Sequence, residues 1–257
     1  SGGWPLTIIM TPDKKPFFAA TYIPRESRFG RSGMTSLLPA VSEAWRHRNR
    51  EILASADQIV SAVHTSAGEA APGELAEAVL AAAYEQLSHR FDARFGGFGD
   101  APKFPPPHNL LFLLRYWKRS GNAFALDMVM QTLSAMRRGG VYDHIGFGFH
   151  RYSTDERWLV PHFEKMLYDQ ALLTIAYTEA FQATGSKEFE ETAREIITYV
   201  LRELTSTEGG FYSAEDADSE GEEGRYYLWT VAEIEQLLAP EEAALVLRVF
   251  NAEPGGN

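Results

Sequence analysis

Titratable and aromatic side chains are concentrated between residues 142 and 169. Histidines and carboxylates can transfer protons, and a cation beside them stabilises the negative charge that develops during the transfer. Such groups gathered in one pocket are typical of acid–base catalysis. We expect the catalytic residues to be His150, His162, Glu164 and Asp169. The residues of this segment that we expect to bind substrate are Tyr142, Asp143, His144, Arg151, Trp158, Lys165 and Tyr168.

The pattern around these residues predicts a helix over 162–183, with Pro161 in its first turn, where the missing N–H needs no partner. On such a helix His162, Lys165 and Asp169 would share one face. The rest of the helix is mostly apolar, so its polar groups lie at the N-terminal end, where the helix dipole favours a developing negative charge. The pattern therefore predicts a pocket floor at this helix start.

A structural interpretation of the same residues stays open. Lys165 and Asp169 have the spacing of an ordinary i,i+4 ion pair, and Arg151 could simply brace a loop. The three histidines of the segment lack the four-residue spacing that places two imidazoles on one metal ion. We expect no metal site and no cofactor.

A second cluster of carboxylates lies between residues 215 and 223. Its beginning resembles an EF-hand loop, but the twelfth position is Tyr227, where a bidentate glutamate is required. Carboxylates can accept hydrogen bonds from sugar hydroxyls while aromatic rings stack on the sugar. A pair of carboxylates could also catalyse glycoside hydrolysis. The alternative is that some of these acidic residues belong to a solvated loop. The residues that we add to the expected substrate-binding set are Lys103, Glu215, Asp216 and Asp218.

The composition excludes several classes of function. The 257 residues carry 24 Lys and Arg against 35 Asp and Glu, a net charge of −11, so a nucleic-acid partner is not expected. There is no cysteine, which excludes disulfides and thiol chemistry within this chain. We see neither a membrane-spanning stretch nor a basic-then-apolar targeting pattern, and we expect a cytoplasmic protein with no membrane partner. The chain starts at Ser1 and stops within a loop, so we expect an internal piece of a longer protein.

The apolar periodicity changes once along the chain. Apolar runs at 6–10 and 17–23 predict an antiparallel strand pair, followed by a helix over 35–63. Small and breaker residues over 65–73 predict a linker. Beyond the linker the periodicity is that of helices, which we expect near residues 74–91, 107–119, 123–138, 162–183, 187–204 and 231–249.

Three of the connections between these helices contain a Gly-Gly pair followed by apolar and aromatic residues. Their second glycines are Gly97, Gly140 and Gly210. Helical hairpins with glycine turns on one rim predict a ring or a solenoid of hairpins. Thr230 and Glu233 have the spacing of a capping box that begins the last helix.

Three long motifs are specific enough to indicate a family: Gly2-Gly-Trp-Pro-Leu-Thr7, Ala101-Pro-Lys-Phe-Pro105 and Val160-Pro-His-Phe-Glu-Lys-Met-Leu-Tyr-Asp169. With them the chain resembles the thioredoxin-domain-containing family of spermatogenesis-associated protein 20 and bacterial YyaL-like proteins. The resemblance implies a mainly α fold: a partial (α/α)6 toroid of helical hairpins, preceded by the C-terminal half of a thioredoxin-like α/β domain.

The resemblance also implies the domain limits. Residues 1–64 would be the partial thioredoxin-like domain without its Cys motif, with Pro5 at the position of that fold's cis-proline. Residues 65–73 would be the linker, and residues 74–257 about half of a toroid like those of N-acylglucosamine 2-epimerases and six-hairpin glycosidases.

Three functions follow from these observations. The first is a carbohydrate-processing protein, similar to a sugar epimerase or isomerase or to a glycosidase, with acid–base residues in the toroid pocket. The second is a thioredoxin-linked redox or protein-folding factor whose toroid is a non-catalytic scaffold. The third is a binding scaffold without turnover. In the first case the partner is a small carbohydrate.

Overall fold

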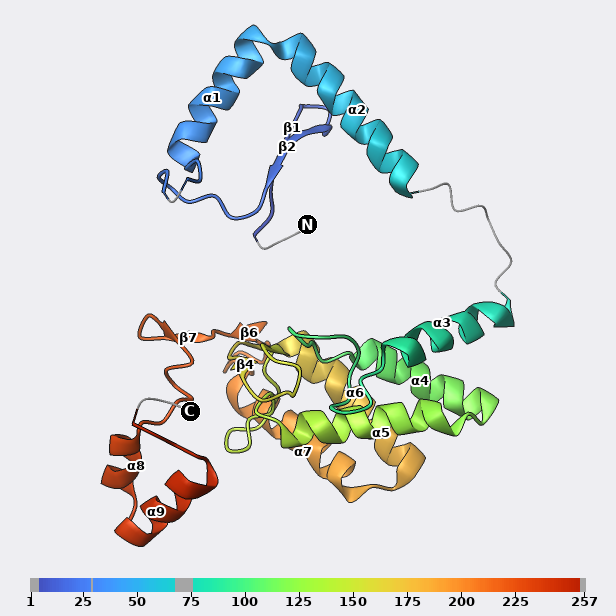
Figure 1. The fold of residues 1–257 in the computed structure, drawn as a ribbon, viewed down its shortest axis with the longest axis vertical. Coiled ribbons are helices and arrows are strands. Elements are labelled where there is room, and N and C mark those ends of the chain that lie inside the picture. The colour runs from blue at the N-terminus through green and yellow to red at the C-terminus, as the bar shows by residue number, and fades with distance from the viewer. Residues whose placement is uncertain (1–4, 29, 68–75, 255–257) are drawn as a thin grey trace. The chain divides into compact units, whose positions relative to one another are not determined.

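The computed structural model describes residues 5–28, 30–67 and 76–254 of the chain. The chain divides into two compact units, with the boundary between residues 75 and 76 (Figure 1). Residues 68–73 of the predicted linker lie outside the described residues, and residues 65–67 are the last residues of a helix.

The first unit begins with the predicted strand pair. Strand β1 (Thr7–Met10) pairs antiparallel with β2 (Pro16–Ala20), and the turn between them is closed by two backbone hydrogen bonds between Thr11 and the lysines at 14 and 15. Lys14 has φ 62°, in the left-handed region that favours glycine. The predicted cis peptide bond before Pro5 lies outside the described residues.

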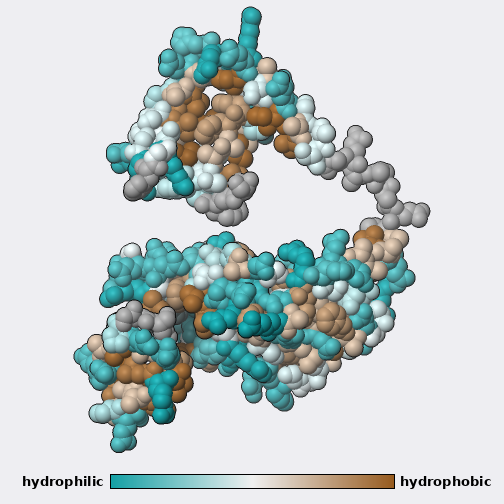
Figure 2. Space-filling model, in the orientation of Figure 1, coloured by the Kyte–Doolittle hydropathy of each residue, from teal (hydrophilic) through white to brown (hydrophobic). Residues whose placement is uncertain are grey.

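Two helices replace the single helix predicted over 35–63. Helix α1 (Met34–His47) is followed by Arg48, whose φ of −128° is not helical. Helix α2 (Asn49–Ala67) begins at the next residue. Trp45 of α1 stacks on Phe17 of β2 with ring centroids 6.1 Å apart. In Figure 2 the hydrophobic residues of this unit gather on the strand pair and on the helix faces turned toward it.

The second unit is helical, which confirms the mainly α class. Helices α4 (Pro107–Ser120), α5 (Ala123–Arg138) and α7 (Lys187–Glu203) match their predicted ranges within a residue, and α3 (Glu77–Arg90) begins three residues late. Gly121 and Gly185, both with positive φ, cap α4 and α6 (Leu167–Thr184) and join them to the helices that follow. The helix predicted over 231–249 divides into α8 (Val231–Leu237) and α9 (Pro240–Val249), since proline has no N–H to continue a helix; the predicted capping box begins α8.

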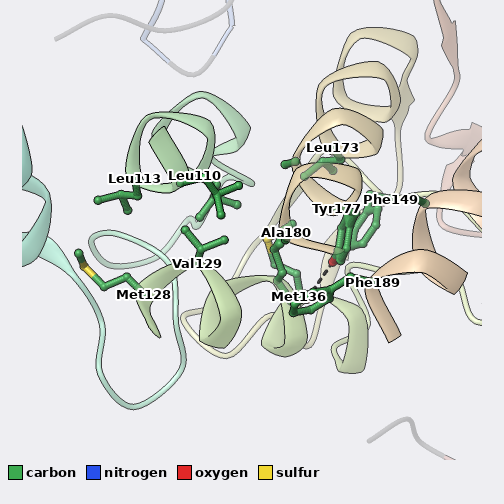
Figure 3. Close-up of a cluster of buried hydrophobic side chains, with 14 of the residues drawn as sticks. Leu110, Leu113, Met128, Val129, Met136, Phe149, Leu173, Tyr177, Ala180 and Phe189 are labelled. Atoms are coloured by element: carbon green, nitrogen blue, oxygen red, sulfur yellow. Dashed lines mark hydrogen bonds between the residues drawn. The ribbon is translucent and has the colours of Figure 1, made fainter. Parts of the chain in front are cut away.

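The core of this unit lies between α4, α5, α6 and α7. Leu110, Val129 and Leu173 come from three different helices and are fully buried. Figure 3 shows Tyr177 of α6 among them, with its hydroxyl donating a 2.8 Å hydrogen bond to the Leu133 carbonyl. Truncating a buried leucine of such a core costs about 2–5 kcal/mol. The helices are therefore a rigid base for the loops at their ends.

The segment before α6 corrects the sequence prediction. Helix α6 begins at Leu167, and residues 161–166 are extended. Strand β4 (Pro161–His162) pairs with β3 (Tyr152–Ser153), and β5 (Lys165–Met166) pairs with β6 (Ala214–Glu215). The backbone N–H and C=O groups of this stretch form hydrogen bonds with two other segments. The stretch is therefore not part of the helix. The polar residues at 162, 165 and 169 therefore share no helical face.

Three long loops of the second unit are tied together by hydrogen bonds. The loop after α3 bonds to the loop after α5 through a two-way backbone bridge between Lys103 and Ser153. The latter loop bonds to the one after α7 through β5 and β6, and that third loop ends in a small hairpin of β7 (Asp218–Ser219) and β8 (Glu222–Glu223). The loops of β4 and β6 lie side by side in Figure 1. Of the helices that the structure describes, none combines the length and the apolar character needed to cross a membrane.

Candidate functional site

Asp169 lies in the first turn of α6, beside the loop after α5, and is 7% exposed. Within residues 5–28, 30–67 and 76–254, its Oδ2 is the one fully buried side-chain oxygen or nitrogen without a hydrogen-bond partner. Burial raises the pKa of Asp169 to about 7; Arg151 opposes this rise and Glu164 adds to it. A carboxyl with this pKa is a proton donor or acceptor at neutral pH.

Arg151 and Glu164 form an ion pair next to Asp169. Arg151 Nη1 lies 2.6 Å from Glu164 Oε2, and the backbone N–H of Arg151 donates to the Glu164 carbonyl at 2.8 Å. Both side chains are partly exposed. The pair therefore presents donors and acceptors at the surface of the site without adding net charge.

His162 lies between two carboxylates. Its Nδ1 contacts Glu223 of β8, and its Nε2 lies 3.7 Å from Glu164 Oε2. The imidazole stacks on Tyr152 with centroids 4.9 Å apart, and Tyr152 stacks on Phe104 at 4.7 Å. Phe104 is 54% exposed, so this row of three rings ends at solvent.

His150 is buried at the back of the site. Its Nδ1 lies 3.0 Å from the Phe163 carbonyl, which can only accept, so Nδ1 carries the proton and Nε2 the lone pair. The ring makes edge contacts with Phe163 and Tyr227 at 5.4 and 4.8 Å. Burial and then the charge of Lys165 lower the pKa of His150 to about 4, so the imidazole is neutral at pH 7.

Lys165 is 1% exposed and does not pair with Asp169, which excludes the i,i+4 interpretation. Its Nζ lies 2.7 Å from Asp143 Oδ2 and 2.9 Å from the Phe147 carbonyl. Burial lowers the pKa of Lys165; burial alone would raise that of Asp143, but the lysine outweighs it and the pKa of Asp143 is lowered. The Lys165 ammonium is held inside this loop by Asp143 and the Phe147 carbonyl, which gives it a structural role.

Several other residues predicted to bind substrate are engaged elsewhere. Lys103 is buried, and its three ammonium protons go to Asp92, the Gly96 carbonyl and the Glu156 carbonyl. Trp158 is fully buried and donates from Nε1 to the Phe95 carbonyl at 3.0 Å. The structure therefore gives both residues a structural role.

Tyr142 and His144 face α7 and α5 rather than Asp169. The Tyr142 hydroxyl donates to Glu195 Oε2, and the Arg137 guanidinium lies 4.1 Å from the centre of the tyrosine ring. His144 is exposed and lies between Arg137 and the Gly139 carbonyl. These contacts form a network with α5 and α7, in which Tyr142 is buried.

The residues of the predicted acidic cluster do not lie together either. Glu215 accepts hydrogen bonds of 2.6 Å from the hydroxyls of Tyr199 and Tyr227, which places it in the buried group around Lys165. Asp216 and Asp218 are exposed, and Asp216 Oδ1 accepts the backbone N–H of Asp218. Tyr168 is 49% exposed beside Arg151. In the part of the chain that the structure describes, no three His, Asp or Glu side chains are grouped so as to hold a metal ion.

Comparison with known proteins gives the relatives of the chain. Residues 1–64 match the family model Thioredox_DsbH, described as a protein of unknown function, DUF255. Spermatogenesis-associated protein 20 of Homo sapiens is 43% identical over 251 residues, covering 92% of this chain and 32% of the human protein. Over this stretch the chain is similar to spermatogenesis-associated protein 20. The uncharacterized protein B0495.5 of Caenorhabditis elegans is 34% identical over 277 residues, covering 100% of this chain and 37% of that protein. The chain thus spans about a third of the length of the curated relatives that it matches.

Two solved structures are similar in fold to part of this chain. Cellobiose 2-epimerase from Bacillus thermoamylovorans B4167 has a TM-score of 0.49 and 15% identity, covering 68% of this chain and 51% of the enzyme. An unsaturated glucuronyl hydrolase specific for heparin has a TM-score of 0.46 and 14% identity, covering 69% of this chain and 55% of the hydrolase.

Some residues of the site escaped the sequence analysis. Phe104 and Tyr152 form the aromatic row with His162, and Tyr199 and Tyr227 enclose Lys165. For Tyr152 a signal existed, since it lies within the stretch of titratable and aromatic residues between 142 and 169. No signal indicated Tyr199, which lies within a regular amphipathic helix.

Proposed function

We propose that the second unit carries an acid–base site that acts on a carbohydrate, with Asp169 as the proton donor and His150 as the proton acceptor. The observation that carries the proposal is the buried Oδ2 of Asp169 without a partner. Folded proteins leave few buried polar atoms unpaired, because each costs about 1–3 kcal/mol. Such an atom at the edge of a site is a strong candidate for a group that bonds to a ligand.

The protonation states of the two groups support the proposal. Asp169, with a pKa of about 7, holds a proton in about half of the molecules at neutral pH, whereas His150, with a pKa of about 4, holds a free lone pair on Nε2. Two groups whose environments shift their pKa values in opposite directions are typical of an acid and a base that act together.

The surroundings of Asp169 suit a sugar. Arg151 and Glu164 offer a donor and an acceptor for neighbouring hydroxyl groups. The rings of Phe104, Tyr152 and His162 offer an aromatic surface on which the apolar face of a pyranose can pack. This combination of paired polar groups and aromatic rings favours a polyhydroxylated, uncharged ligand.

The chemistry is a proton exchange without a net change of oxidation state. In an epimerisation the base takes the proton from the carbon next to a carbonyl, the electron pair is held as an enolate, and the acid returns a proton to that carbon from the other face. In a hydrolysis the acid protonates the leaving oxygen, and the base takes a proton from the water whose oxygen becomes the new hydroxyl group on the sugar carbon. Both reactions use the same two roles.

The test is binding and turnover with a panel of neutral monosaccharides and disaccharides. Calorimetry should detect a ligand, and product analysis by NMR should detect conversion. We expect Asp169→Asn to abolish conversion, whereas Asp127→Asn, which changes an exposed aspartate of α5, should leave it unchanged. Conversion that survives Asp169→Asn, or a panel without any ligand, would refute the proposal.

The match of residues 1–64 to a thioredoxin-like family model favours a second candidate, a redox or protein-folding factor whose helical unit is a scaffold. Thiol chemistry would then come from another polypeptide segment, because this chain contains no cysteine. Sugar binding without any product would favour a scaffold role over the enzyme.

A further inference from the structure

The loops after α3 and α5 contain the same hydrogen-bonded turn. The backbone N–H of Asp92 donates to the Gly97 carbonyl at 3.0 Å, and that of Asp143 donates to the Gly148 carbonyl at 3.0 Å. In both turns Oδ1 of the aspartate accepts the backbone N–H groups two and three residues further on. The structural repeat therefore relates Gly97 to Gly148, not to the predicted Gly140.

A buried lysine closes the first turn. Lys103 Nζ lies 2.6 Å from Asp92 Oδ2, 2.9 Å from the Gly96 carbonyl and 2.8 Å from the Glu156 carbonyl. The ring of Trp158 lies 5.4 Å from the ammonium group. All three protons of Lys103 have oxygen acceptors, so this turn is a closed structural unit.

Lys165 closes the second turn with the matching contacts to Asp143 and to the carbonyl of Phe147. Among the residues that the structure describes, no third oxygen atom accepts a hydrogen bond from Lys165. In its place the rings of Tyr199 and Tyr227 lie 4.4 and 5.1 Å from Nζ. The second lysine turn is therefore a variant of the first, with aromatic rings where the first has a carbonyl.

Tyr227, one of the two rings at the second lysine turn, also packs against His150. Tyr227 lies between the two groups, 5.1 Å from Lys165 Nζ and 4.8 Å from the centre of the His150 ring. The Tyr227 hydroxyl donates to Glu215, the strand partner of Lys165. One lysine therefore joins the turn, the strand pair and the ring against which His150 packs.

We propose that Lys165 is a positioning residue for His150: its ammonium group holds Tyr227 against the imidazole and places a positive charge near the ring. The assignment of His150 as the base rests on the proposed function. The geometry around it does not.

The charges that face His150 give the sign of the effect. Lys165 opposes protonation of the imidazole, as burial does. Asp143 and Glu215 favour protonation, and so does the hydrogen bond to the Phe163 carbonyl. If the lysine charge is removed, the two carboxylates remain, and the pKa of His150 must rise.

The experiment is an NMR titration of the His150 imidazole in the full chain without sugar. We expect Lys165→Met to raise the pKa of His150 by about one unit or more, as removal of a nearby charge does. Lys103→Met, the matched change in the first turn, should leave it unchanged. An unchanged pKa in Lys165→Met, or an equal shift in both variants, would overturn the proposal.

A second pair of variants covers the case in which a lysine variant does not fold. Glu215→Gln keeps an oxygen acceptor for the two tyrosines but removes a charge that favours protonation, so it should lower the pKa of His150. Glu195→Gln, which changes another glutamate that accepts from a tyrosine, should not. A rise or no change in Glu215→Gln would contradict the proposal. Because no sugar is present, the result is independent of whether the site turns over a substrate.

Discussion

Replacing Asp169 by asparagine should make the protein more stable at alkaline pH. The pKa of this carboxyl rises from 3.8 to about 7 on folding. This is a shift of about three units, and at 1.36 kcal/mol per unit the ionised form is destabilised by about 4 kcal/mol in the folded state. Because the side chain is only 7% exposed, solvent screens little of this cost.

The sign of the pH dependence follows from proton uptake. Between pH 4 and pH 7 the folded state keeps a proton on Asp169 that the unfolded state has released, so the free energy of unfolding falls as the pH rises. Asparagine has the same shape and does not ionise. The two proteins should therefore differ least near pH 4, and the variant should gain up to about 4 kcal/mol by pH 8.

The assay is urea-induced unfolding at several pH values from 4 to 8, followed by circular dichroism at a helix band. Asp127→Asn is the control for the loss of one negative charge on the same unit, and its difference from the native protein should not change with pH in this way. A difference between Asp169→Asn and the native protein that is constant from pH 4 to pH 8 would refute the burial of an ionisable group at this position. A variant that is less stable at pH 8 would refute the sign.

Three further changes test other parts of the structure. Gly148→Ala should lower the free energy of unfolding by about 1–3 kcal/mol, because φ is +79° and the new Cβ would lie 2.6 Å from the Tyr199 ring. Gly121→Ala is the control: φ is +73° there but the space around it is open, so the loss of stability should be smaller in the same denaturation assay. Tyr142→Phe should destabilise by about 1–3 kcal/mol through the lost hydrogen bond to a carboxylate, and calorimetry should show unchanged sugar binding; weakened binding would return this residue to the site. His162→Ala should weaken sugar binding, because it removes one ring of the aromatic row, while the thermal midpoint changes little, since the imidazole is partly exposed; calorimetry that shows unchanged binding would exclude the residue from the site.

The elements governed by local interactions could be predicted from the sequence. Helices α4, α5 and α7 have a clear apolar periodicity, and their observed bounds agree with the predicted ones because hydrogen bonds within a helix join residues four apart. The capping box joins Thr230 to Glu233, and the β1–β2 pair joins segments on the two sides of a single turn, from Met10 with Pro16 to Thr7 with Ala20. For all of these the interacting partners lie in one short stretch of the sequence.

The start of α6 could not be predicted in this way. Residues 161–166 suit a helix, with a proline followed by polar residues and an apolar run. Their backbone instead pairs with residues 152–153 and 214–215, the latter far along the chain. Pairing with distant segments overrides a local preference of a few tenths of a kcal/mol per residue.

For the candidate site the sequence by itself determined the inventory: histidines, carboxylates and aromatic rings concentrated in one stretch, in a chain without cysteine. Only the tertiary structure decided the partners. Lys165 bonds to Asp143 rather than to Asp169, Oδ2 of Asp169 lies buried without a hydrogen-bond partner among the described residues, and the ammonium of Lys103 is bound inside a turn. The physical reason is that spacing along the chain determines contacts within one or two turns, whereas burial and charge depend on segments brought together by the fold. A pKa, and with it a chemical role, follows from those surroundings.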